Sequence, residues 1–227
     1  MCGRYTLTAP GDAIVEAFDL QGDLEVAPRY NIAPTQEVAA VRVEKPAAER
    51  ALVHLKWGLV PRWAEDPSIG NRMINARSET VAEKPAFRWA FKKQRCLVLA
   101  DGYYEWKKLA DGTKQPYYFR LEGGKPFGFA ALWERWGKEG EEVQSCALLT
   151  TSPNELAATV HDRMPVILSP EDYDLWLDPA TSDAGKLASL LMSYPAGEME
   201  TWPVSRFVNK PANDSPRCIE PVAEGSG

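Results

Sequence analysis

The sequence predicts an α+β protein whose core is a mainly antiparallel, twisted and barrel-like β-sheet with short helices at its periphery. Short apolar and β-branched runs alternate with Asp-Gly and Gly-Gly turns, which is typical of antiparallel strands. Helical periodicity is confined to a few short segments. With 44% hydrophobic and 26% charged residues, 227 residues are enough for one substantial core. We therefore expect a single domain over residues 1–222, followed by a disordered tail at 223–227.

The expected strands share apolar, β-branched and aromatic residues, and they cover residues 2–7, 37–43, 51–60, 96–107 with a turn at 101–102, 116–121, 127–136, 145–153 and 164–168. The expected helices share apolar spacing or start signals, and they cover residues 10–20, 78–93, a short segment capped by Asn154, 169–177 and 184–192. Ser78 is expected to cap the second helix, and Pro85 to break or kink it. Residues 57–79 mix Trp, Pro, Gly, Asn and Arg without periodicity, which indicates a functional loop.

The charge of the chain is unevenly distributed. The net charge is −6, which taken alone argues against a nucleic-acid partner. However, residues 54–95 contain nine Lys and Arg against four Asp and Glu, whereas residues 134–227 contain seven against sixteen. A basic patch can bind phosphates inside an acidic protein, because counterion release depends on the local patch. A solvated basic helix would have the same composition, so charge alone leaves both interpretations open.

Composition also argues against several classes of protein. There is no run of 18 apolar residues and no signal-peptide pattern, so we expect a cytoplasmic protein that does not contact a membrane. The four cysteines form no CxxC pair and the two histidines are distant from them in sequence. We therefore expect neither a metal nor a cofactor. Cys96 and Cys146 lie in apolar, strand-like runs and are expected to be buried, reduced thiols.

Cys2 follows the initiator methionine and could become the first residue of the mature chain. Removal of Met1, for example by methionine aminopeptidase, would leave an α-amine and a thiol on one residue, with reference pKa values of about 8 and about 8.5. An aldehyde could then form an imine with the nitrogen and be attacked by the sulfur, which gives a five-membered thiazolidine. The alternative is that Cys2 is simply a small buried residue of the first strand, and position alone favours that alternative.

Four segments carry polar residues that a strand or a turn does not explain: CGR at 2–4, NARSE at 75–79, DGYYEW at 101–106 and HDRMP at 161–165. Together with YNIAP, WGLVP, QPYYF and PVS in this order, they make the chain resemble the SOS response-associated peptidase (SRAP) family of abasic-site processing proteins over nearly its whole length. The resemblance implies the SRAP fold, removal of Met1 by the protein itself, and a role in DNA damage. It also implies an enzyme whose N-terminal Cys2 cross-links to the aldehyde of an abasic site in single-stranded DNA, ending as a thiazolidine.

Three further residues are expected to be catalytic together with Cys2. Glu105 lies among tyrosines and a tryptophan, where the pKa of a carboxyl group rises toward neutrality and suits a general acid and base. His161 can titrate in the physiological range and could move the proton that opens the sugar ring. Asn75 could orient the abasic sugar or the Cys2 amine. Apart from the resemblance, an ion-paired glutamate, a packed histidine and a turn-forming asparagine would explain these residues equally.

Six residues are expected to contact the DNA, namely Arg4, Trp63, Arg77, Ser78, Trp106 and Arg163. Each of the three arginines lies two residues from a proposed catalytic residue and could bind a flanking phosphate, although surface ion pairs would explain them too. The two tryptophans could stack on bases beside the lesion. The expected partner is single-stranded DNA with abasic sites, bound by a monomer. Peptidase activity beyond Met1 and lyase activity through the imine are left open.

Two other functions stay open on sequence grounds. Class II glutamine amidotransferases also begin with Met-Cys-Gly and use the thiolate against an amide, with the α-amine as base. The rest of their pattern and their four-layer αββα order are not expected here. The chain could also bind single-stranded DNA without a covalent bond, through residues 54–95. Ammonia release from glutamine would favour the first alternative, and the absence of an adduct on a denaturing gel would favour the second.

Overall fold

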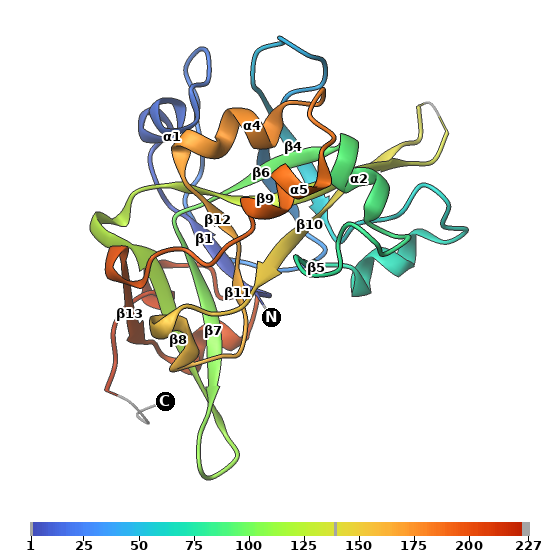
Figure 1. The fold of residues 1–227 in the computed structure, drawn as a ribbon. Coiled ribbons are helices and arrows are strands. Elements are labelled where there is room, and N and C mark those ends of the chain that lie inside the picture. The colour runs from blue at the N-terminus through green and yellow to red at the C-terminus, as the bar shows by residue number, and fades with distance from the viewer. Residues whose placement is uncertain (1, 139, 224–227) are drawn as a thin grey trace.

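The computed structural model describes residues 2–138 and 140–223 of the chain, so Met1 and most of the expected tail lie outside the described residues. The strands are β1 (Tyr5–Leu7), β2 (Arg29–Ile32), β3 (Glu37–Arg42), β4 (Ala51–Trp57), β5 (Asn75–Arg77), β6 (Arg95–Ala100), β7 (Gly102–Lys108), β8 (Lys114–Leu121), β9 (Phe127–Trp136), β10 (Val143–Thr151), β11 (Met164–Pro165), β12 (Ile167–Leu168) and β13 (Met199–Pro203). The α-helices are α1 (Gly11–Phe18), α2 (Arg88–Lys93), α3 (Glu155–Ala158), α4 (Tyr173–Leu177) and α5 (Ala184–Ser189) (Figure 1). Short 3₁₀ turns lie at Pro67–Arg72, Glu122–Gly124, Pro170–Asp172, Ala196–Glu198, Arg206–Asn209 and Pro216–Cys218.

Five strands close into a barrel. β4 pairs with β3, β3 with β6, β6 with β9 and β9 with β10, all antiparallel, and β10 completes the ring by pairing parallel to β4. β5 and β11 extend the barrel by pairing with β10, and β12 pairs with β9. The expected α+β fold with a mainly antiparallel, barrel-like core is confirmed, and the parallel β4–β10 and β5–β10 pairs are its exceptions.

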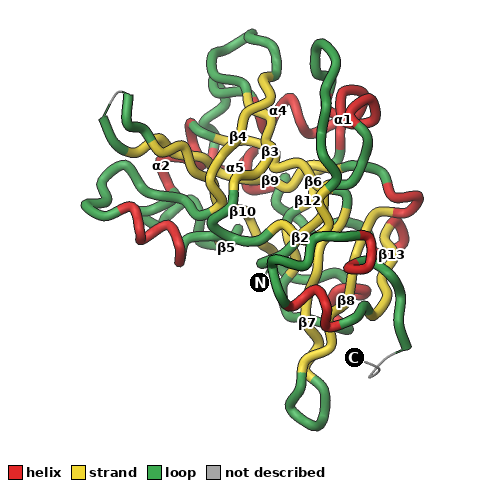
Figure 2. Tube along the Cα trace, turned by 180° about the vertical axis from the view of Figure 1, so that it is seen from behind, coloured by secondary structure: helices red, strands yellow, loops and turns green. Residues whose placement is uncertain are grey.

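The second sheet is antiparallel and has the order β13-β8-β7-β1-β2. One face joins the barrel core, where the rings of Tyr5 and Tyr103 pack edge-on against Phe129 of β9. The other face carries Tyr104 and Tyr118, which form a smaller core with residues 204–222, called here the C-terminal segment. The hairpin of β7 and β8 extends away from the barrel in both views (Figures 1 and 2). This sheet is therefore covered on both faces.

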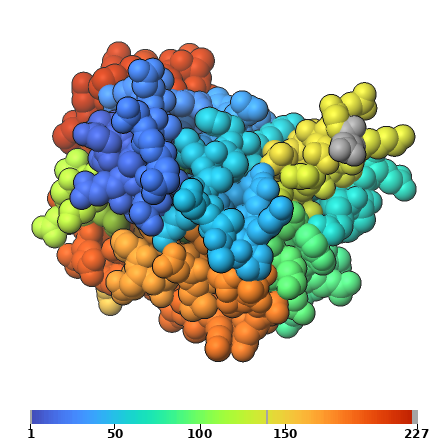
Figure 3. All heavy atoms as spheres, turned by 90° about the horizontal axis from the view of Figure 1, so that it is seen from above, coloured from blue at the N-terminus to red at the C-terminus, as the bar shows by residue number. Residues whose placement is uncertain are grey.

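The helices lie at the periphery, as expected. Gly11–Phe18 forms α1, which buries Ile14 and Phe18, and the Phe18 ring stacks on Tyr173 of α4 with 5.6 Å between ring centroids. Seen from above, α1 and the loop between β3 and β4 lie together on this end of the molecule (Figure 3). Trp176 of α4 donates a 2.9 Å hydrogen bond to the Cys96 carbonyl of β6, which fixes the helix against the barrel. No helix among the described residues is long and apolar enough to cross a bilayer.

The helix expected over residues 78–93 is wrong in its first half. Residues 78–87 form turns, and α2 begins at Arg88 with Phe87 in the N-cap position. Pro85 lacks an N–H and disfavours helical geometry in the residue before it, which ends the pattern there. Ser78 therefore caps no helix, and its backbone N–H instead donates to the Thr150 carbonyl of β10 at 2.9 Å.

Residues 57–79 are less irregular than the composition indicates, because they end in β5. The chain crosses itself closely on the way, since a Cβ atom on Gly58 would lie 2.6 Å from the carbonyl oxygen of Gly70. Gly58 also has a φ of 136°, which side chains rarely adopt. Only glycine fits this crossing, which holds the loop over residues 61–74 against the barrel and delivers Asn75 to β10.

Candidate active site

Four segments that are distant in sequence meet where the two sheets adjoin. β7 pairs with β1, and the N–H of Tyr104 donates to the carbonyl of Arg4 at 3.0 Å, just before β1 begins. β5 and β11 both pair with β10, which brings Asn75 and the residues before Met164 to the same edge. The start of the described chain lies between these strands (Figures 1 and 2). The sequence-predicted residues Cys2, Asn75, Glu105 and His161 are thus brought together in one cluster of side chains, which is called here the Cys2 pocket.

Cys2 is fully buried and held by its backbone. The Asn75 side chain donates a 2.8 Å hydrogen bond from Nδ2 to the Cys2 carbonyl, while the Cys2 Sγ lies 4.0 Å from the Arg4 carbonyl oxygen. Burial, and next the nearby Glu105 carboxylate, raise the pKa of the Cys2 thiol. The Asn75 Oδ1 is buried and accepts no hydrogen bond from any described residue. A thiol of this kind stays protonated at neutral pH unless a base removes its proton.

Glu105 is 3% exposed and lies on the face of β7 that is turned toward the barrel. Burial raises the pKa of its carboxyl group, and His161 opposes that shift. Tyr103, two residues earlier on the same face, is also fully buried, and burial followed by the charges of Cys2 and Glu105 raises the pKa of its phenol. The predicted burial of Glu105 is therefore present, and it shifts the pKa of the carboxyl group in the direction that favours the protonated form.

His161 links Glu105 to the solvent. Its Nε2 lies 3.9 Å from Glu105 Oε2, and its side chain is 27% exposed. The Arg163 N–H donates to Nδ1 at 3.0 Å, which leaves Nε2 to carry the proton in the neutral ring. The Asp162 Oδ1 lies 3.0 Å from the same Nδ1. The imidazole therefore lies between the buried Glu105 carboxyl and the solvent.

Arg163 connects two segments of the pocket through hydrogen bonds and an ion pair. Its guanidinium makes a two-pronged ion pair with Glu79, 2.9 Å between Nη2 and Oε2, and also donates to the Thr150 carbonyl at 2.6 Å. This pairing lowers the pKa of the Glu79 carboxyl. Arg163, expected to contact DNA, therefore ties the His161 loop to the end of the NARSE segment and to β10.

The other expected DNA contacts fall on two sides of the pocket. Arg77 is exposed on β5 and forms no ion pair with any described residue, and Trp63 is 56% exposed on the 61–74 loop. Ser78 is half-buried, and its N–H donates to the Thr150 carbonyl, which also accepts from Arg163. Trp106, by contrast, lies on the face of β7 opposite Glu105 and donates from Nε1 to Asn209 at 2.8 Å.

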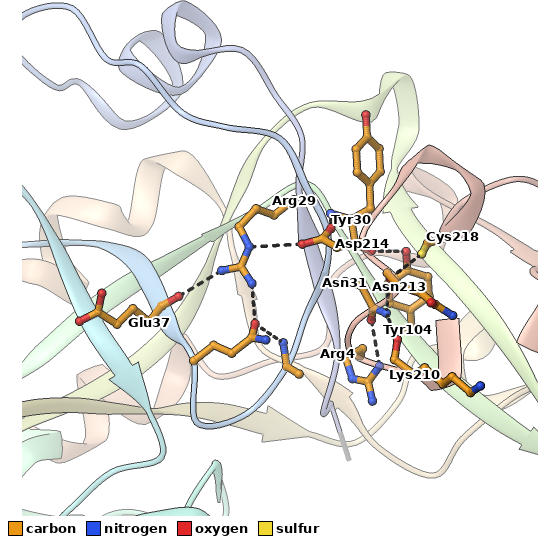
Figure 4. A network of polar contacts seen from close by, with 12 residues as sticks. Arg4, Arg29, Tyr30, Asn31, Glu37, Tyr104, Lys210, Asn213, Asp214 and Cys218 are labelled. Atoms are coloured by element: carbon orange, nitrogen blue, oxygen red, sulfur yellow. Dashed lines mark hydrogen bonds and ion pairs between the residues drawn. The ribbon is translucent and has the colours of Figure 1, made fainter. Parts of the chain in front are cut away.

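Arg4 lies with Trp106, its guanidinium carbon 5.8 Å from the centre of the Trp106 rings. It donates to the Asn31 side chain at 2.9 Å and to the Val208 carbonyl at 2.8 Å, in a network that joins β2 to the C-terminal segment (Figure 4). Sequence reasoning missed Asn31, which is fully buried. The available signal was a carboxamide directly before the apolar residues of YNIAP, since a buried polar side chain must find partners.

Other features of the sequence have structural explanations. Arg95, counted in the basic segment, is buried and donates to the carbonyls of Phe91, Trp176 and Thr181. All four cysteines are free and buried, as predicted for Cys96 and Cys146. Within residues 2–138 and 140–223, no group of three or more His, Cys, Asp or Glu side chains is arranged to hold a metal ion.

Comparison with known proteins gives a consistent family. The family model described as SOS response associated peptidase (SRAP) matches residues 1–211. The abasic site processing protein YoqW of Bacillus subtilis is 45% identical over 97% of this chain and 99% of its own length, and YedK of Escherichia coli is 31% identical over 98% and 100%. A crystal structure of a protein from Bacteroides thetaiotaomicron, 26% identical, superposes with a TM-score of 0.85 over 97% of this chain and 100% of the other. The chain therefore belongs to the SOS response associated peptidase family.

Proposed function

We propose that this protein processes abasic sites in single-stranded DNA by forming a covalent thiazolidine between Cys2 and the ring-opened sugar. Relatives that are 31–45% identical over nearly the whole chain are named abasic site processing proteins, which supports the substrate. The observation that carries the chemistry is the enclosure of Cys2 by Asn75 on its carbonyl and by a buried carboxyl that has a histidine beside it. Such a site supplies a nucleophile, an orienting amide and a proton relay.

The first step requires a free amine on Cys2, so the bond between Met1 and Cys2 must be hydrolysed before the reaction begins. We propose that the pocket itself performs this cleavage. The neutral amine then attacks the sugar aldehyde and forms a carbinolamine. Asn75 Oδ1, which accepts from no described residue, is suited to accept a hydrogen bond from the amine and direct its lone pair.

Glu105 is suited to the two later proton transfers. In its acid form it protonates the carbinolamine hydroxyl, which leaves as water and gives the imine. In its base form it takes the proton of the buried Cys2 thiol, and the sulfur adds to the imine carbon while the nitrogen regains a proton. The net reaction joins amine, thiol and aldehyde with the loss of one water. His161 returns protons between Glu105 and solvent.

The test is to incubate the purified protein with single-stranded DNA that carries one abasic site and to measure intact mass. We expect an adduct whose mass equals protein without Met1 plus DNA minus one water, mapped by peptide sequencing to Cys2. Cys2→Ala should give no adduct, and Cys2→Ser only an imine that heating reverses, because the hydroxyl is a poor replacement for the thiol. A heat-stable adduct with either variant, or an adduct at another residue, contradicts the mechanism.

The same preparation separates the two alternatives. A glutamine amidohydrolase would release ammonia from glutamine, and this release would depend on Cys2. A non-covalent binder would retard the DNA on a native gel and lose it on a denaturing gel. We expect no ammonia release and a band that survives denaturation.

A further inference from the structure

The buried side chain of Asn31 lies at the centre of a network of hydrogen bonds (Figure 4). Its Oδ1 accepts the hydrogen bond of Arg4, and its Nδ2 lies 3.1, 3.0 and 2.7 Å from the carbonyl oxygens of Val208, Lys210 and Asn213. Three acceptors on one side and one donor on the other require a carboxamide in this orientation. A carboxylate at this position would face three carbonyl oxygens, and an aliphatic side chain would remove the Asn31 donor from all three and leave the Val208 carbonyl with Arg4 alone.

The network connects the two ends of the chain. Arg4 belongs to the first segment, Asn31 to β2, and the three carbonyls to the C-terminal segment. The C-terminal segment holds its own shape through a 2.6 Å hydrogen bond from the Asn213 side chain to the Phe207 carbonyl. It is fastened to β2 a second time by a hydrogen bond from the N–H of Tyr30 to Asp214. Arg4 is therefore bound to a rigid partner.

Fixing Arg4 also fixes Cys2. The Arg4 carbonyl accepts from the N–H of Tyr104, whose neighbour on β7 is Glu105, and it also faces the Cys2 thiol. Only Gly3 separates Arg4 from Cys2, and chain ends fray unless they are tied down. The backbone of Cys2 is thus held at two points, by Asn75 on its own carbonyl and by the anchored Arg4 two residues later.

We infer that Asn31 is a positioning residue, which holds Cys2 against Glu105 by anchoring Arg4 to the C-terminal segment. This inference rests on the proposed function. It gives the half-buried Arg4 a positioning role through its partners within the chain, and it makes the C-terminal segment part of the machinery that orients the nucleophile. Displacements of about 1 Å at a reacting group can lower a rate by about a hundredfold.

The experiment measures adduct formation in single turnovers at saturating DNA, and separately measures DNA affinity in a Cys2→Ala background. Asn31→Ala should lower the maximal rate by at least about tenfold, with the dissociation constant and its salt dependence unchanged. Arg4→Met, which keeps length and loses the guanidinium, should produce the same loss. The double variant should be no slower than either single variant, because both break one anchor. Gln21→Ala removes an exposed carboxamide and serves as the control with an unchanged rate.

Three results would overturn the inference. The first is an unchanged maximal rate in folded Asn31→Ala. The second is a double variant in which the losses of rate multiply. The third is a weaker salt dependence of DNA binding in Arg4→Met, because a lost phosphate contact has that effect. If Asn31→Ala does not fold, Arg4→Met alone decides. If the wild type forms no adduct, the proposed function fails. Hydrogen exchange then tests separately whether Arg4 anchors the amino-terminal residues. Faster exchange in residues 2–6 of the Arg4→Met variant supports it, and unchanged exchange contradicts it.

Discussion

The Cys2 pocket and the 61–74 loop differ in what surrounds their side chains. In the pocket, Asn75 and Glu105 lie on strands and are held by contacts with other parts of the chain, and Cys2 is fully buried. On the loop, Trp63 is 56% exposed and lines an open hollow with Asp66, Ile69 and Arg72. Rigid strands suit chemistry that tolerates little displacement, whereas an exposed loop suits contact with a flexible strand of DNA.

This difference implies that rate and affinity are separable in this protein. Changes in the pocket should alter the rate of adduct formation and leave binding intact. Changes on the exposed surface should alter binding and leave the maximal rate intact. Four measurements test whether rate and affinity are separable.

The largest effect is expected for Glu105→Gln, which removes the proposed acid and base while keeping the shape of the side chain. We expect the single-turnover rate to fall by about 10² or more, the usual contribution of general acid–base catalysis. The dissociation constant for abasic DNA should stay within about twofold, since the side chain is buried. A fall in affinity equal to the fall in rate would show that the pocket and the binding surface are one unit.

Glu105→Gln should raise the stability of the folded protein although it lowers the rate of adduct formation. The pKa of Glu105 is raised in the folded protein, so the folded state binds its proton more tightly than the unfolded state. The stability of the wild type therefore falls as the pH rises from the unfolded value, about 4.3, through the raised folded value. At pH 7 the melting temperature of Glu105→Gln should lie above that of the wild type by on the order of a few degrees. This difference should shrink toward pH 4. An equal difference in melting temperature at pH 7 and at pH 4 would contradict the raised pKa of Glu105.

Arg77 and Arg163 provide a matched pair of substitutions to alanine. Arg77→Ala should weaken binding to any single strand by on the order of tenfold and reduce the salt slope by about one charge, because its guanidinium is exposed and unpaired among the described residues. Arg163→Ala should lower the melting temperature by leaving Glu79 and Thr150 without their partner. Binding titrations at several salt concentrations and thermal melts distinguish them; if Arg163→Ala alone flattens the salt slope, the two roles are exchanged.

The smallest effect is expected for Trp63→Ala. Loss of one stacked base should weaken binding by ~1 kcal/mol, with the maximal rate unchanged. Trp89→Ala is the control, because Trp89 is 40% exposed but lies 3.1 Å beneath the guanidinium carbon of Arg62, which occupies its face. Fluorescence titration of both variants measures the effect, and equal losses would remove Trp63 from the contact.

Local signals in the sequence predicted local structure well. Asn154 caps α3 through its side chain as expected, and α2 begins only after Pro85, at Arg88. The burial of Glu105 was also predicted, although of its neighbours in the sequence only Tyr103 shares its face of β7, and Tyr104 and Trp106 lie on the other face. Local chemistry of this kind depends on residues within one or two turns of chain.

Long-range pairs could not be predicted from the sequence alone. Glu79 lies 84 residues from Arg163, and Arg4 lies 204 residues from Val208. Each pair depends on which strands become neighbours, and no spacing rule connects them. Consequently the sequence suggested phosphate contacts for Arg4 and Arg163, but it could not show the partners that both side chains have within the chain.

The hydrogen bonds that join Arg4 and Asn31 to the C-terminal segment have a consequence for local opening. The carbonyls that accept them belong to residues 208, 210 and 213, so any opening of the C-terminal segment also removes partners of Arg4 and Asn31. Segments that share such contacts open together. Amide hydrogens near Arg4 and those of the C-terminal segment are therefore expected to exchange as one unit.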